Sequence, residues 1–191
     1  MDTRKHKTNL TNILIDIYKD ATLASHLGFK GGTCTMLFYK LPLFWLISYE
    51  KGEHNIKVEV STRDNPYNHY NNHPFYGVTI KTLAIEDIIA HKMVAFTERP
   101  SLANRDLFDI HFLLGTEFAA SINYDVIKSR TGKNPVEFYN FLLNLIKKID
   151  AKNILEGLGE VLTDSQKDWA KVKLLVELKG LIQRQIDTVA T

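Results

Sequence analysis

The sequence is poor in the features that mark secreted, disulfide-stabilised or membrane-spanning proteins. It holds one cysteine, Cys34, among 191 residues, which excludes an intramolecular disulfide and predicts a small buried side chain in a reducing compartment. Residues 1–12 contain no apolar core of a secretory signal. The most apolar stretch, residues 35–49, is interrupted by Lys40 and Pro42 and is shorter than the roughly 20 residues that a bilayer requires. We therefore expect a cytoplasmic protein with no membrane partner.

An excess of charge of one sign is also missing. The chain has 24 Lys and Arg against 22 Asp and Glu, a formal net charge of +2 and a pI near 8.5. Binding to a nucleic-acid backbone needs clustered cations, so this excess does not by itself predict RNA or DNA as a partner. In residues 164–184 basic and acidic side chains are interleaved, which is typical of a solvated helix face. A contribution of this face to RNA binding stays open.

The sequence does contain a clear change of hydrophobic pattern near residue 85. Before this point, apolar residues follow helical spacing at first and then the period of two that strands have. The expected elements are helices in residues 10–27 and 34–39, antiparallel strands at 43–49 and 56–62 joined by a turn at 51–55, a surface loop at 64–74 and a short third strand at 77–80. Beyond it, helices are expected from residue 85 onward and at 104–114, 126–130, 135–149 and 165–187.

These patterns predict the α+β class, with a small mixed sheet flanked by helices and followed by a C-terminal helical bundle. We place an α/β part in residues 1–100 and a helical part, packed on it, in residues 101–191. A 45% share of hydrophobic residues is typical of such a folded protein.

Two candidate binding features lie in the first part. Gly31, Gly32 and Thr33 precede an apolar helix, where glycines allow backbone amides to approach a phosphate and the helix N-terminus attracts an anion. A tight turn explains the same residues. Glu59 alternates with two valines on an expected strand, so its carboxylate is either a metal ligand or an ordinary solvated side chain.

Two further features follow on successive helices. Lys92 could supply positive charge to a phosphate, and Asp106 could accept a proton or bind a metal. Asp109 lies three residues after Asp106, so the two carboxylates should share a helix face, with Arg105 turned away. The simpler interpretation is a helix start with Asn104 as its N-cap.

Taken in order, these pieces resemble the nucleotidyltransferase-like AbiEii toxins of abortive-infection and toxin–antitoxin systems. The matching segments are residues 30–34, 37–42, 48–63, 86–96 and 99–109, and the Arg-Asp-x-x-Asp segment is the most specific of them.

The resemblance implies a reduced nucleotidyltransferase-like fold and a set of site residues. Gly31, Gly32, Thr33 and Lys92 would bind the nucleotide, and Lys92, Asp106 and Glu59 would be catalytic, with Glu59 also a weak metal ligand. Arg105 and Asp109 would support the site. Mg²⁺ is the cofactor that the family implies. A nucleoside triphosphate, RNA and an antitoxin-like protein are the implied partners.

One departure from the family pattern decides the expected function. In the family an Asp-x-Asp strand and several tens of residues follow the Leu-Pro pair, whereas here Pro42 runs directly into Leu43-Phe44-Trp45. Phosphoryl and nucleotidyl transfer depend on a carboxylate-held divalent metal. We therefore expect a catalytically degenerate member, a pseudoenzyme.

Two alternatives remain open. In one, the protein is an active transferase in which Glu59, Asp106 and Asp109 hold the metal and a nucleotide moves from a triphosphate to RNA or protein. In the other, it is a non-catalytic module that binds an antitoxin-like partner or a second copy through an uncovered sheet edge.

The remaining histidines and aromatic residues favour structural roles. His69 and His73 are four apart, but their segment looks like a loop and offers no third zinc ligand. His111 lies among apolar residues and is expected at the edge of the core, and Trp45 is expected within it.

Overall fold

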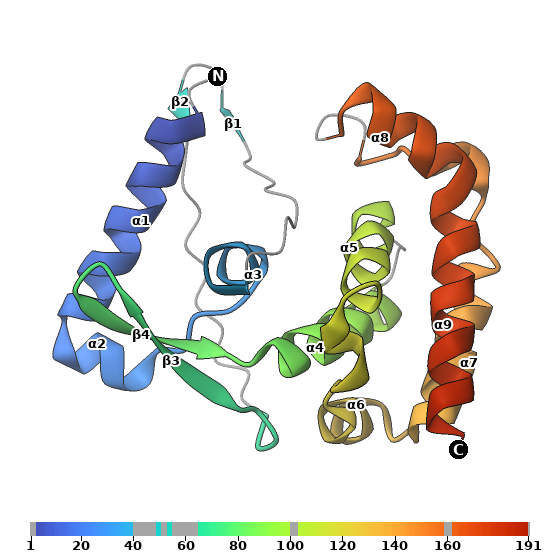
Figure 1. Cartoon of the computed structure of the whole chain (residues 1–191), viewed down its shortest axis with the longest axis horizontal. Coiled ribbons are helices and arrows are strands. Elements are labelled where there is room, and N and C mark those ends of the chain that lie inside the picture. Colours follow the sequence, from blue (N-terminus) through green and yellow to red (C-terminus); the bar gives the residue numbers. More distant parts are fainter. Residues whose placement is uncertain are drawn as a thin grey trace. The chain divides into compact units, whose positions relative to one another are not determined.

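The computed structural model describes residues 3–39, 49–50, 53–54, 65–99, 103–158 and 162–190. Contacts divide the chain into two compact units, Met1–Ala84 and Ile85–Thr191, and each is described by itself (Figure 1). Helices dominate and short antiparallel strand pairs accompany them, so the predicted α+β class is confirmed. The division into an α/β part at residues 1–100 and a helical part at residues 101–191 packed on it stays a prediction.

The first unit contains helices and two antiparallel hairpins. Its elements are α1 (Thr3–Lys19), α2 (Ala21–His26), α3 (Gly32–Tyr39), β1 (Tyr49–Glu50), β2 (Glu53–His54), β3 (Tyr70–Phe75) and β4 (Val78–Leu83). Strands β1 and β2 pair with Tyr49 opposite His54. Glu53 and His54 were predicted within a turn at residues 51–55 but are strand residues, because Glu50 already pairs with Glu53. The rest of that predicted hairpin, including Glu59, and Trp45 lie outside the described residues.

The hairpin of β3 and β4 corrects the prediction of a loop at residues 64–74. Tyr70 pairs with Leu83 and Phe75 with Val78, so β3 is a full strand. The chain reverses at Tyr76 and Gly77, whose φ angles of 45° and 83° are those of the left-handed turns that favour hairpins. Most of the β3 side chains are exposed, and a strand with little burial on either face leaves no alternating pattern to find.

The core of the first unit forms where α1 crosses β4. Leu14, Tyr18 and Ile80 are its buried members, and the Tyr18 hydroxyl donates to the Lys81 carbonyl oxygen at 2.9 Å. The backbone of Phe29 adds a parallel bridge on the other side of β4, opposite Thr82. Cys34 is fully buried as predicted, and burial raises the pKa of its thiol to about 12, so the thiol stays protonated and unreactive at neutral pH.

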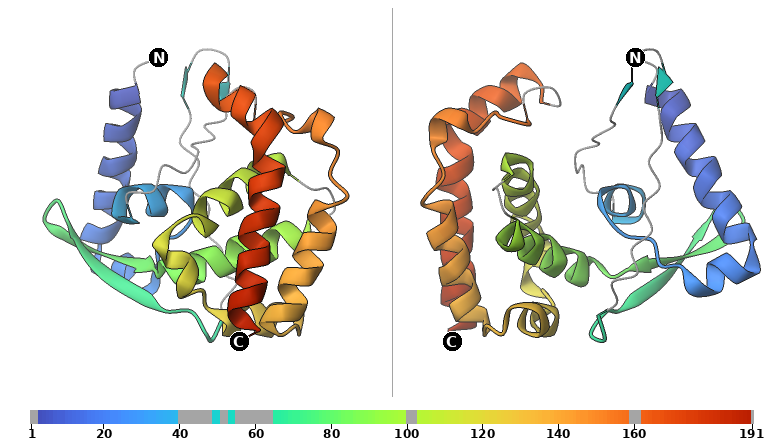
Figure 2. Two further views of the ribbon diagram at one scale, coloured as in Figure 1. Left: turned by 45° about the vertical axis from the view of Figure 1, so that its right-hand side comes forward. Right: turned by 180° about the vertical axis from the view of Figure 1, so that it is seen from behind.

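The second unit is helical. Its elements are α4 (Ile85–Glu98), α5 (Asn104–Leu114), η1 (Glu117–Ala120), α6 (Tyr124–Thr131), α7 (Pro135–Ile146), η2 (Ala151–Asn153), α8 (Asp164–Trp169), the π-helical segment η3 (Ala170–Leu174) and α9 (Leu175–Val189). Helices α7 and α9 run side by side in both views of Figure 2 and pack on each other. Among the described helices, none combines the length and apolarity needed to cross a bilayer.

The start of α5 differs from its prediction in one detail. The N-cap is Ala103, which makes no side-chain capping bond, rather than Asn104. The Asn104 amide instead donates to the carbonyl oxygens of Asn153 and Glu156, at 2.7 and 3.2 Å. Two otherwise exposed carbonyls of the turn after α7 therefore compete for the side chain that sequence spacing assigns to the cap.

Candidate active site

The second unit brings three of the predicted site residues together between α4 and α5. The Lys92 ammonium on α4 donates to Oδ2 of Asp109 on α5 and lies 3.9 Å from Oδ1 of Asp106. The lysine side chain is 23% exposed, whereas each aspartate side chain is 5% exposed. The three-residue spacing of the aspartates thus places both carboxylates on one face, as predicted.

Local sequence explains why these side chains meet. On α4, Ile88, Ile89 and Met93 are almost completely buried, and Lys92 extends from the edge of this apolar stripe toward α5. On α5, Leu107 and Ile110 are fully buried and fix the rotation of the helix. Helix packing therefore sets the position of the charged cluster, and hydrogen bonding completes it.

A fourth charge in this cluster, Arg99, was not identified from the sequence. Its Nε lies 2.6 Å from Oδ2 of Asp106, and its side chain is 43% exposed. The contact is an ion pair without the geometry of a hydrogen bond to that oxygen. A usable signal was present, because Arg99 follows Lys92 by seven residues, or two helical turns.

The cluster is electrically balanced. Lys92 and Arg99 carry two positive charges, and Asp106 and Asp109 carry two negative charges when ionised. Burial raises the pKa of Asp109, while the neighbouring Lys92 charge opposes the rise. Oδ1 of Asp109 is buried and has no hydrogen-bond partner among the described residues, which adds to the cost of ionising this carboxyl.

One electrostatic effect bears on the supporting role expected for Arg105. Arg105 precedes Asp109 by four residues on α5, and its positive charge is a minor influence that lowers the pKa of Asp109. Its wider role in the site stays a prediction.

Polar contacts with α6 hold the two ends of α4. The amide of Asn123 donates to Oδ1 of Asp87 at 2.6 Å, and Asp87 is fully buried. At the other end, Arg130 pairs with Glu98 and lies 3.1 Å from Nδ1 of His91. The ion pair of Arg130 with Glu98 lies at the end of α4 from which Arg99 extends.

The glycine turn belongs to the first unit. Gly31 has a φ of 93°, in the left-handed region, and leads directly into α3. A Cβ added at Gly31 meets no atom within 4 Å, so a larger side chain would not clash here. The left-handed backbone conformation is what favours glycine at this position. A joint nucleotide site of Gly31, Gly32 and Thr33 with Lys92 stays a prediction, as does the role of Glu59.

His73 makes aromatic contacts within the first unit. It lies on β3, and its ring centroid is 5.1 Å from that of Phe38 and 5.8 Å from that of Tyr39. Within the described ranges, no three His, Cys, Asp or Glu side chains are grouped so that they could hold a metal ion.

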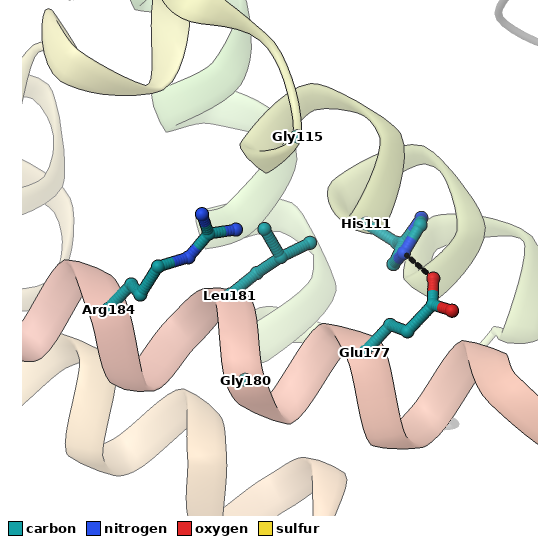
Figure 3. A pocket seen from close by; sticks show the side chains of 6 residues that line it. All are labelled: His111, Gly115, Glu177, Gly180, Leu181 and Arg184. Atoms are coloured by element: carbon teal, nitrogen blue, oxygen red, sulfur yellow. Dashed lines mark hydrogen bonds and ion pairs between the residues drawn. The ribbon is translucent and has the colours of Figure 1, made fainter.

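A separate cavity opens between α5 and α9, with a volume of about 390 Å³. Its lining residues are His111, Gly115, Glu177, Gly180, Leu181 and Arg184 (Figure 3). Nε2 of His111 lies 3.2 Å from Oε2 of Glu177, and the histidine side chain is 18% exposed, which agrees with the predicted place at the core edge. Burial lowers the pKa of His111, and the contact with Glu177 opposes this. The cavity lies between two segments that are far apart in the sequence, so no local sequence pattern predicted it.

Comparison with known proteins identifies a family. Residues 43–174 match a family model described as nucleotidyl transferase AbiEii toxin, type IV toxin–antitoxin system. The matched range contains Glu59, Lys92, Asp106 and Asp109 and begins after the glycine turn. No curated protein and no solved structure matches the chain.

Proposed function

Since the chain belongs to the nucleotidyltransferase AbiEii toxin family of type IV toxin–antitoxin systems, we propose that it is a catalytically degenerate member that retains contact with a nucleotide. The family supplies the partners of this proposal, a nucleotide substrate and an antitoxin. The single cysteine makes the cytoplasm its expected location.

The observation that carries the proposal is the pairing of both aspartates with cations. Asp109 binds the Lys92 ammonium and Asp106 binds Arg99, with Lys92 at 3.9 Å. A magnesium site needs carboxylates whose negative charge is available to the metal ion. Asp106 and Asp109 therefore do not fit the Mg²⁺ that the family generally uses, because their charge is already neutralised.

The sequence around Pro42 supports the same proposal. The family's two metal-binding aspartates are expected directly after this residue, and Leu43-Phe44-Trp45 stands there instead. Nucleotidyl transfer is catalysed mainly by positioning and by neutralising charge on the phosphates. A chain without this pair loses the largest contribution to the reaction, even with Lys92 and Asp106 in place.

The retained cluster favours one alternative, an active transferase that moves a nucleotide from a triphosphate to RNA or protein. The two functions are separated by incubating the purified protein with labelled nucleoside triphosphates, Mg²⁺ or Mn²⁺, and total RNA. We expect no label above background in RNA or in the protein. Label transfer that Asp106→Asn abolishes and Arg184→Ala leaves intact would establish the active alternative.

Transfer to a protein acceptor is covered by the same design. The protein fraction is resolved from RNA before counting, so label on protein is scored separately from label on RNA. Arg184 is the matched control position because it lies on α9, at the other cavity.

A further inference from the structure

We infer that Arg99 is the side chain through which the cluster between α4 and α5 binds the triphosphate group of a nucleotide. The inference rests on the proposed retention of nucleotide contact. It departs from the expectation that Lys92 supplies the phosphate-binding charge.

Lys92 is poorly placed for this task in the structure. Its ammonium contacts Asp109 and lies within 3.9 Å of Asp106, and both of those side chains are only 5% exposed. An ammonium between two buried carboxylates has its charge compensated twice, and pulling it away would leave Asp109 without its hydrogen-bonded cation. Lys92 therefore holds the two aspartates in place.

Arg99 has the opposite environment. It contacts Asp106 through Nε, at 2.6 Å, and its side chain is 43% exposed. A guanidinium carries five N–H donors, so the two terminal nitrogens keep four donors beyond this contact. Those nitrogens form the planar fork that binds phosphate oxygens in pairs.

The surroundings also orient this guanidinium. Asp106 holds it at one edge, and Asp106 is itself fixed on α5. The preceding residue, Glu98, is paired with Arg130 of α6, so the end of α4 is held on both sides. A pre-oriented arginine loses less conformational freedom when it binds a ligand than a free surface side chain does.

The test measures binding of inorganic tripolyphosphate, GTP and ATP by isothermal titration calorimetry, without any transfer reaction. We expect Arg99→Ala to raise the Kd for all three by at least about tenfold, because charged hydrogen bonds are lost. Arg99→Lys keeps the charge but not the fork, and we expect a smaller increase in Kd. Arg184→Ala removes the same charge on α9, and its Kd should change by less than about twofold.

Thermal unfolding of each variant separates binding from structure. If Arg99 only stabilises Asp106, Arg99→Ala lowers the Tm and leaves the tripolyphosphate Kd unchanged, which overturns the inference. A short single-stranded RNA with a 5′ hydroxyl forms a second arm. Loss of RNA binding alone would assign Arg99 to phosphodiesters and would also overturn it.

The two proposals fail separately. Absence of triphosphate binding by the unmodified protein would overturn both the retained nucleotide contact and the role of Arg99, whereas triphosphate binding that Arg99→Ala leaves unchanged would overturn the role of Arg99 alone. Conversely, label transfer together with Arg99-dependent binding would refute catalytic degeneracy and support the role of Arg99.

Discussion

Helix α5 (Asn104–Leu114) carries two polar sites that differ in almost every physical respect. One face presents Asp106 and Asp109 to Lys92, where the charges are buried and balanced. The other face presents His111 to an open cavity with Glu177 and Arg184. Because buried charges have no water to replace a lost partner, the first site should behave as one unit. The second should tolerate the loss of single members.

The largest expected effect comes from removing the central cation of the buried cluster. Lys92→Met keeps most of the side-chain volume but leaves Asp106 and Asp109 with less compensation. We expect the free energy of unfolding to fall by about 3–5 kcal/mol, measured by urea denaturation.

The matched control for this variant is Arg184→Met in the open cavity. It should change stability by less than about 0.5 kcal/mol, since it removes an exposed cation. Equal losses of unfolding free energy in Lys92→Met and Arg184→Met would contradict the difference between the two faces of α5.

A smaller effect is expected from pH. Burial lowers the pKa of His111 from its ordinary value of 6.5 in the folded state. As the pH falls below 6.5, the unfolded chain takes up a proton at this histidine before the folded chain does. His111 therefore contributes stability that is present above pH 6.5 and is lost as the pH falls toward the lowered pKa, by at most about 1.4 kcal/mol per pH unit.

Urea denaturation between pH 5 and pH 7.5 tests this, with His111→Gln as the comparison. The variant should lose this part of the pH dependence. If the slope of unfolding free energy against pH is the same in His111→Gln as in the unmodified protein, the face of α5 toward the cavity does not exclude water from the imidazole.

The smallest expected effect is a gain in stability. Gly180 lies inside α9 at the cavity, and an added Cβ meets no atom within 4 Å. Gly180→Ala should therefore raise the free energy of unfolding by about 0.5–1 kcal/mol, through helix propensity alone. Gly132→Ala is the control that should destabilise, since Gly132 ends α6 with a φ of 71°. A loss of stability in Gly180→Ala would mean that the cavity is closed in solution.

Sequence patterns predicted best where one helix face is buried. The bounds of α5 and the start of α4 follow from apolar spacing, and the shared face of Asp106 and Asp109 follows from helix geometry. Membership of the family was likewise readable from the order of short motifs, and the family match confirms it.

The failures have a common physical cause. Strand β3 exists because it pairs with β4 across a left-handed turn, and Asn104 turns to the carbonyls of a segment about fifty residues away. Arg99 lies one residue beyond the end of α4, so its seven-residue spacing from Lys92 signals a shared face only if the helix is taken to continue. In each case a tertiary contact determines the outcome, and hydrophobic periodicity does not encode that contact.

The π-helical segment η3 has a consequence for comparing relatives. A π turn takes in one residue more than an α turn, so the residues before Ala170–Leu174 are rotated by about 100° relative to a regular helix. Trp169 precedes this segment, and its ring lies 4.9 Å from that of His111. A homologue shorter by one residue within this segment would point its indole away from α5 while aligning almost perfectly on both sides. A single-residue gap at this segment in a sequence alignment therefore indicates a change of tertiary packing.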